Sequence, residues 1–173
     1  TNAVGDKGTV YAIAPPPRPN APAGAPAPNA AVTALAAEAA YPNIKVVTAR
    51  ASELTLPEPV DVVWTSLNYH DFRNAPNADM KAFNANVLKA LKPGGTYIVI
   101  DHRGEAGSGA RDTQTLHRVD PELVKSEVVA AGFKFEGASD VLKHPDDPHT
   151  ARVHDPSVRG KTDQFLLKFS KPK

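Results

Sequence analysis

Two short apolar runs in the middle of the chain constrain its fold more than any other feature. The first is VDVVW at residues 60–64, and the second is YIVI at residues 97–100. Both are nearly continuous and rich in β-branched residues, as strands covered on both faces of a parallel sheet require. A helical interval and a KPGG turn at residues 92–95 lie between them. The pattern therefore predicts a strand, a helix and a second strand of an α/β fold.

Polar side chains follow both predicted strands at the point where each strand ends. They are Asn68, Tyr69, His70 and Asp71 after the first strand, and Asp101 and His102 after the second. In an open α/β sheet, ligands bind outside the carboxyl ends of the strands. We therefore expect these side chains to share one edge of the sheet and to form the candidate site.

The rest of the sequence predicts further helices and strands of the same kind of fold. Helices are predicted from their caps and apolar spacing over residues 30–40 after Asn29, from Asn77 or Asp79 to Leu91, and from Asp120 to Gly132. Strands are predicted over residues 9–14, 44–48, 133–141 and 164–169.

Two segments have the composition of loops. Residues 15–28 contain seven prolines, which predicts an extended, polyproline-like surface loop; a proline motif for a partner is the alternative. Residues 143–163 form a long polar segment that offers nitrogen and oxygen ligands in His144, Asp146, Asp147, His149, His154 and Asp155. Their spacing does not place them on one helix face, so we predict no metal site there.

Composition limits the classes of partner and of chemistry. The chain has 20 Lys and Arg against 19 Asp and Glu, so its net charge of +1 favours neither nucleic acid nor an anionic membrane. No apolar run is long enough to span a bilayer. The absence of cysteine excludes disulfides and thiolate chemistry but leaves cytoplasm and periplasm open. The length suits a single domain over residues 1–173.

Several longer motifs accompany the KPGG turn: NYHDF, DHRGEAGSG, LHRVD and RGKTDQFLLKF. With them the chain resembles class I S-adenosylmethionine-dependent methyltransferases, and in particular a bacterial family of predicted methyltransferases of unassigned substrate. The resemblance extends from Gly5 onward. It implies a three-layer, Rossmann-like and mostly parallel sheet with a C-terminal antiparallel hairpin. It also implies that the first strand and its glycine-rich cofactor loop are missing.

The resemblance implies a function and a set of site residues. S-adenosylmethionine would donate a methyl group to a small-molecule acceptor. The implied catalytic residues are Tyr69, His70 as general base, and Asp101; the implied substrate contacts are His102, His117 and Arg118; and the implied cofactor contacts are Ala14, Ser52, Glu53 and Asn68. Ala14 stands where this class often has an acidic residue that binds the ribose.

Other interpretations of the same residues stay open at this point. His70 could hydrogen-bond Asp71 across the loop, and Asp101 and His102 could simply satisfy the backbone where their strand ends. The chain could be a non-catalytic interaction module that keeps the fold, or a nicotinamide-dependent reductase. A missing first strand would leave backbone groups unpaired, which predicts either a homodimer through that edge or a covering segment.

Overall fold

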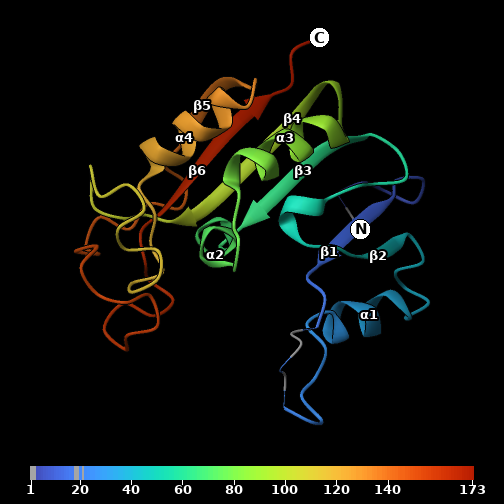
Figure 1. Cartoon of the computed structure of the whole chain (residues 1–173), viewed down its shortest axis with the longest axis horizontal. Coiled ribbons are helices and arrows are strands. Elements are labelled where there is room, and N and C mark those ends of the chain that lie inside the picture. The colour runs from blue at the N-terminus through green and yellow to red at the C-terminus, as the bar shows by residue number, and fades with distance from the viewer. Residues whose placement is uncertain (1–2, 18–19, 21) are drawn as a thin grey trace. The chain divides into compact units, whose positions relative to one another are not determined.

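The computed structural model describes residues 3–17, 20 and 22–173. Within them the chain divides into two compact units, Thr1–Leu56 and Pro57–Lys173, and each unit contains its own sheet (Figure 1). None of the helices among the described residues is long and apolar enough to cross a membrane.

The first unit is built on two parallel strands. β1 (Val10–Ala14) pairs with β2 (Ile44–Thr48), and the short helix α1 (Ala30–Ala36) comes between them in the chain. α1 is shorter than predicted, and the side chain of Asn29 donates to Thr48 Oγ1 at 3.3 Å instead of capping the helix. Residues 18, 19 and 21 of the predicted proline-rich loop lie outside the described residues; the rest of that loop contains no helix or strand.

The second unit contains a mixed sheet of four strands, in the order β3, β4, β6, β5. Their bounds are β3 (Val60–Ser66), β4 (Leu91–His102), β5 (Lys134–Ser139) and β6 (Gln164–Ser170). β3 and β4 are parallel, whereas β6 is antiparallel to both β4 and β5. The predicted strand, helix and strand unit and the C-terminal antiparallel hairpin are therefore confirmed. The described strands form two sheets instead of the one mostly parallel sheet that was predicted.

Three helices accompany this second sheet: α2 (Tyr69–Asn74), α3 (Met80–Ala90) and α4 (Pro121–Ala130). The carboxylate of Asp79 accepts from Ala82 N at 2.9 Å at the start of α3. Asp120 does the same for Glu122 N at 2.9 Å at the start of α4, where Pro121 occupies the first position. The cap at Asp120 was predicted, and Asp79 was one of two predicted starts of α3, the other being Asn77. In both caps a side-chain oxygen satisfies an amide that the helix itself leaves unpaired. α2 was not predicted.

The KPGG segment is an irregular part of β4. α3 ends at Ala90, as a helix before a proline should, and β4 begins at once. The pairing then jumps from Leu91 opposite Val60 to Thr96 opposite Val62, so the segment bulges out of the ladder. Gly94 has φ 76°, a conformation that suits glycine, and its N–H donates to Lys171 O at 3.0 Å. Beyond this bulge the register is regular, from Thr96 opposite Val62 to Ile100 opposite Ser66.

The two faces of the four-stranded sheet are covered differently. Pairing places Val63 beside Tyr97 and Trp64 beside Ile98, so Tyr97 and Trp64 belong to opposite faces. α3 and α4 pack on the Tyr97 face, where Val87, Val99, Val124, Val128 and Phe169 are buried (Figure 1). On the other face Val62 and Trp64 are 54% and 59% exposed. The prediction that β3 is covered on both faces is therefore wrong within this unit, because α3 and α4 both lie on one face of its sheet.

Candidate functional site

The ends of β3 and β4 bring His70 and Asp101 into direct contact. The backbone N–H of His70 donates to Asp101 Oδ2 at 2.8 Å, and the ring Nδ1 lies 2.8 Å from Asp101 Oδ1. Asp101 Oδ1 also accepts from His102 N at 2.8 Å. Asp101 is fully buried and His70 is 3% exposed. The predicted meeting of the two strand ends at one edge is confirmed.

These contacts fix the tautomer of His70. A carboxylate only accepts hydrogen bonds, so Nδ1 must carry a proton and donate it to Asp101. The other ring nitrogen, Nε2, is left to act as an acceptor or a ligand when the imidazole is neutral. Burial lowers the pKa of His70, but the hydrogen bond and the charge of Asp101 more than offset this, so the pKa lies above its ordinary value.

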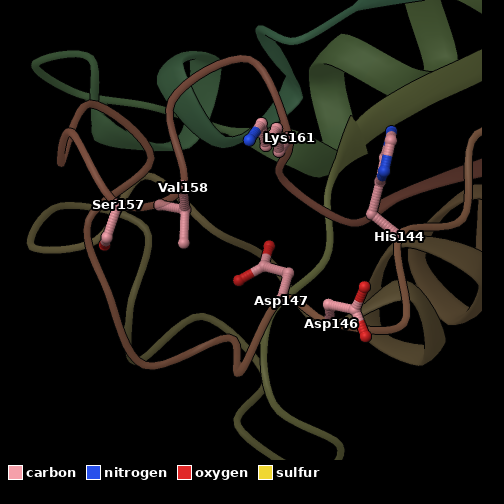
Figure 2. Close-up of a pocket in the computed structure, with 6 residues that line it drawn as sticks. All are labelled: His144, Asp146, Asp147, Ser157, Val158 and Lys161. Carbon is pink, nitrogen blue, oxygen red and sulfur yellow. The ribbon is translucent and has the colours of Figure 1, made fainter.

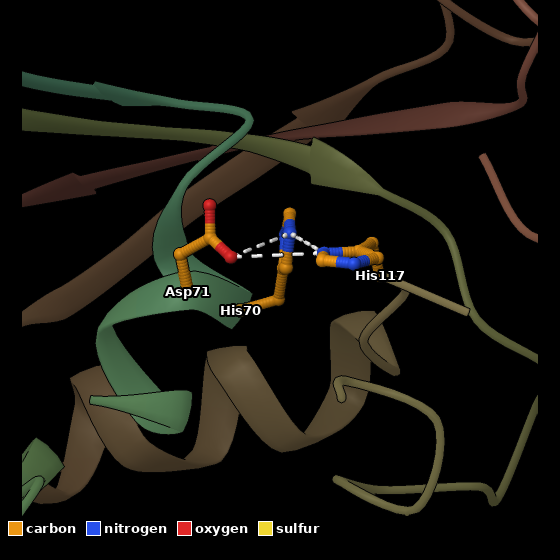
Figure 3. A group of neighbouring side chains, drawn as sticks. All are labelled: His70, Asp71 and His117. Atoms are coloured by element: carbon orange, nitrogen blue, oxygen red, sulfur yellow. Dashed lines mark hydrogen bonds and ion pairs between the residues drawn. The ribbon is translucent and has the colours of Figure 1, made fainter. Parts of the chain in front are cut away.

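Two further side chains lie close to His70 Nε2, one from the start of α2 and one from the loop before α4 (Figure 3). His117 Nδ1 is 3.3 Å away and Asp71 Oδ1 is 3.4 Å away. His117 has φ 58°, in the left-handed region that few histidines adopt. Burial, and then the charge of His70, lower the pKa of His117. His117, which was predicted to contact the substrate, therefore lies beside His70, which was predicted to be catalytic.

His102 lies beside this group and is held by a second loop. Its Nδ1 is 2.9 Å from Thr162 Oγ1, and its ring centroid is 6.1 Å from that of His70. Burial lowers the pKa of His102 to about 4, which keeps the imidazole neutral at ordinary pH. The structure therefore places this predicted substrate contact at the same edge.

Arg118 lies inside the protein. It is fully buried, and its guanidinium makes a two-pronged contact with Asp147, at 2.8 and 3.0 Å. It also donates to Ala151 O at 2.9 Å and to Arg103 O at 3.0 Å. This geometry gives Arg118 a structural role, because it ties the loop that carries His117 to the long polar segment.

Tyr69 is also turned away from the strand-end group. It is fully buried, its hydroxyl donates to Glu127 Oε2 at 3.0 Å, and it accepts from Asn84 Nδ2 at 2.8 Å. Glu127 in turn pairs with Arg73. Burial, with the charge of Glu127, holds the pKa of Tyr69 far above its ordinary value. The hydroxyl therefore joins α2 to α3 and α4.

We expect Tyr69→Phe to lower the free energy of unfolding by about 1–3 kcal/mol, because it removes the hydrogen-bond partner of the buried Asn84 Nδ2 and one hydrogen bond of Glu127, which keeps its pair with Arg73. Urea denaturation followed by circular dichroism measures the change. Thr162→Val is measured for comparison, because it removes the hydroxyl that is hydrogen-bonded to His102 in the strand-end group. If Tyr69→Phe leaves the free energy of unfolding unchanged, the structural assignment of Tyr69 is wrong.

The predicted cofactor contacts are divided between the two units. Ala14 ends β1 and is buried; Ser52 and Glu53 lie in the short helix η1 (Ala51–Glu53), where Glu53 is 3.5 Å from Arg50. Asn68 begins α2 in the second unit. Its Oδ1 is buried without a hydrogen-bond partner among the described residues, as an atom awaiting a ligand would be. Asn68 thus fits a cofactor contact, whereas Ala14 offers no carboxylate for a ribose.

The long polar segment carries a separate pocket (Figure 2). Its lining comprises His144, Asp146, Asp147, Ser157, Val158 and Lys161. The carboxylate of Asp147 accepts hydrogen bonds from Arg118, and His149 Nε2 lies 2.9 Å from Asp163 Oδ2. Among the described residues, the group with ligand atoms close enough to share a metal ion is His70, Asp71 and His117, outside this segment. The sequence placed Asp71 at the strand-end edge and offered it as a hydrogen-bond partner of His70, but did not predict it as a metal ligand.

Comparison of sequences finds no family model and no curated protein that matches this chain. Comparison of structures finds many matches. A SAM dependent methyltransferase from Aquifex aeolicus matches over 98% of this chain and 72% of its own, with TM-score 0.62 and 17% identity. The glycopeptide N-methyltransferase MtfA complexed with S-adenosyl-L-methionine matches over 96% and 82%, with TM-score 0.61 and 15% identity.

The [4+2]-cyclase SpnF also matches, over 80% of this chain, with TM-score 0.57 and 16% identity. The chain spans 61% of the length of that cyclase. At these identities the comparisons establish the fold. The chain has the α/β fold of class I S-adenosylmethionine-dependent methyltransferases, as its sequence motifs predicted.

Proposed function

We propose that this chain supports S-adenosylmethionine-dependent methyl transfer to a small-molecule acceptor, and that its strand-end group forms the acceptor side. The observation that carries the proposal is the His70 and Asp101 pair at the ends of adjacent parallel strands, in a chain with this fold. That edge is where open α/β sheets bind their ligands. In this proposal residues 1–173 form one methyltransferase-like domain to which both units belong.

The cofactor, when bound, supplies a methyl group on a sulfonium, and the protein has mainly to align the acceptor with it. Asp101 holds the His70 ring with Nε2 available, so His70 can take a proton from an acceptor hydroxyl or amine. His102 and His117 flank that ring and can contact the acceptor. Asp101 is a positioning residue in this scheme, whereas Tyr69 is given no contact with the acceptor, because its hydroxyl bonds Glu127 and Asn84.

Asn68 is the proposed cofactor contact in the second unit, since its buried Oδ1 lacks a partner inside the described protein. Ala14, Ser52 and Glu53 are the proposed contacts in the first unit, toward the adenosine. Arg118 is left out of the acceptor contacts, because its guanidinium is held by Asp147 and by two carbonyl oxygens.

A second candidate is a binding or interaction module with this fold and no methyl transfer. Two observations favour it: Ala14 brings no carboxylate to the end of β1, and the matched cyclase shows that the fold is used outside methyl transfer. Titration with the cofactor distinguishes methyl transfer from the binding module.

Isothermal titration with S-adenosylmethionine and with S-adenosylhomocysteine tests the proposal. We expect both to bind with a stoichiometry of one, and Asn68→Ala to weaken binding by about tenfold, the value of one hydrogen bond. Asn77→Gly is the matched control, because Asn77 is exposed and has φ 58°, which glycine tolerates. Failure of the protein to bind either nucleoside favours the module.

A further inference from the structure

We propose that His70, Asp71 and His117 bind a divalent transition-metal ion such as Zn²⁺. The ligand atoms form a triangle (Figure 3): His70 Nε2 is 3.3 Å from His117 Nδ1 and 3.4 Å from Asp71 Oδ1, and the third side measures 3.7 Å. Two ligands of a tetrahedral zinc ion, each about 2.0–2.1 Å from the metal, lie about 3.3–3.4 Å apart. The three atoms therefore stand almost at the separation that one ion requires.

Asp101 prepares His70 to be a ligand. A metal-bound histidine commonly donates its other ring N–H to a carboxylate, which fixes the tautomer and raises the basicity of the ligating nitrogen. His70 Nδ1 makes this contact with Asp101 at 2.8 Å, and the carboxylate is itself held by the N–H groups of His70 and His102. The free lone pair of His70 is thus aimed at His117 and Asp71.

His117 is held in a costly backbone conformation. Its φ of 58° brings the ring to His70, with a ring-centroid distance of 5.3 Å. Strained residues persist where the surroundings fix them, and they cluster at functional sites. The surroundings are the neighbouring Arg118, buried and bonded to Asp147, and the N–H of Val153, which donates to Leu116 O at 3.1 Å. The fold therefore supports this placement of His117 from both sides.

The ligand set selects the kind of ion. Two imidazoles and one carboxylate suit zinc, iron and similar transition metals, whereas magnesium and calcium prefer oxygen. Asp71 is 57% exposed and His117 22% exposed, so the ion would keep an open position toward solvent or an acceptor. The ion and an acceptor proton compete for the same lone pair of His70. The metal-site proposal does not rest on the proposed methyl transfer, and metal binding can be tested separately.

The contact between Arg152 and His117 disfavours metal binding. The guanidinium NH2 of Arg152 lies 3.1 Å from His117 Nε2, and a guanidinium only donates hydrogen bonds. This contact places the His117 proton on Nδ1, the atom that must bind the metal. Arg152 is exposed and can move away. Removing it should therefore favour the metal-binding tautomer.

Titration of the whole chain with Co²⁺, followed by its visible absorption and then by displacement with Zn²⁺, tests the site. We expect one ion per chain. Asp71→Asn and His117→Asn should each weaken Co²⁺ binding at least about tenfold, because loss of a residue that only hydrogen-bonds a metal ligand already has an effect of that size. Asn is chosen at position 117 because it tolerates a positive φ. Arg152→Gln should strengthen binding, and His144→Ala, in the long polar segment, should leave it unchanged.

The proposal is overturned if the wild-type chain binds no stoichiometric Co²⁺, or if His144→Ala weakens binding while Asp71→Asn does not. Circular dichroism checks that each variant is folded. If His117→Asn fails to fold, Asp71→Asn decides the question alone, because its side chain is largely exposed. The cofactor titration is carried out on metal-free protein, so failure of either proposal is recognised without reference to the other.

Discussion

Replacing Arg118 with methionine is expected to lower the free energy of unfolding by about 3–5 kcal/mol, the cost of leaving a buried charge without its partner. Asp147 has a fully buried side chain and would keep only the backbone N–H groups of Asp163, at 2.7 Å, and of His149, at 3.1 Å. Methionine fills much of the volume of the arginine stem, so the loss comes chiefly from the charge.

Chemical denaturation of the wild type, Arg118→Met, Asp147→Leu and the double variant measures this effect and its coupling. The double variant should be more stable than the sum of the two single changes predicts, since no charge is then left alone. Arg111→Met is the control: this arginine also contacts two carboxylates but is 60% exposed, and its loss should leave the denaturation midpoint where it is. Equal midpoints for Arg118→Met and Arg111→Met would contradict the assignment.

Asp101→Asn is expected to lower the free energy of unfolding by about 2–4 kcal/mol, although it only replaces one carboxylate oxygen with an NH2 group. Both oxygens of Asp101 accept hydrogen bonds, from two backbone N–H groups and from the His70 ring, all at 2.8 Å. An amide has one oxygen, so its NH2 group must face a donor in a fully buried position.

The thermal midpoint and urea denaturation of Asp101→Asn, measured beside Asp71→Asn, test this expectation. Asp71 is the same residue type in the same cluster, but it is 57% exposed, so its change to asparagine should stay within about 0.5 kcal/mol. Similar stabilities for the two variants would show that Asp101 does not organise the strand ends as described.

The strand-end edge could be predicted because local signals agreed with the fold. Apolar β-branched runs located β3 and β4, and parallel pairing then required Asn68 to His70 and Asp101 to His102 to meet. Asp79 and Asp120 indicated the starts of α3 and α4 through capping chemistry that depends only on neighbouring residues. The contact between His70 and Asp101 follows from this placement.

The rest of the site depends on contacts between distant segments, which a single sequence does not contain. His117 reaches His70 through a left-handed residue, a feature with no signature in the letters LHRVD. Arg118 looks like an exposed substrate contact until its partner Asp147, 29 positions away, is known. β3 looks fully covered because its composition is apolar, yet the side that carries Val62 and Trp64 has no helix of its unit upon it.

That uncovered side gives the molecule a natural optical probe. Trp64 is the single tryptophan of the chain, and more than half of its surface is open to solvent. Its fluorescence therefore originates from one known position on β3, and quenching by a dissolved reagent reports how accessible that position is. Any strand, helix or second molecule that settles on this part of the sheet will change the emission without the need for an attached label.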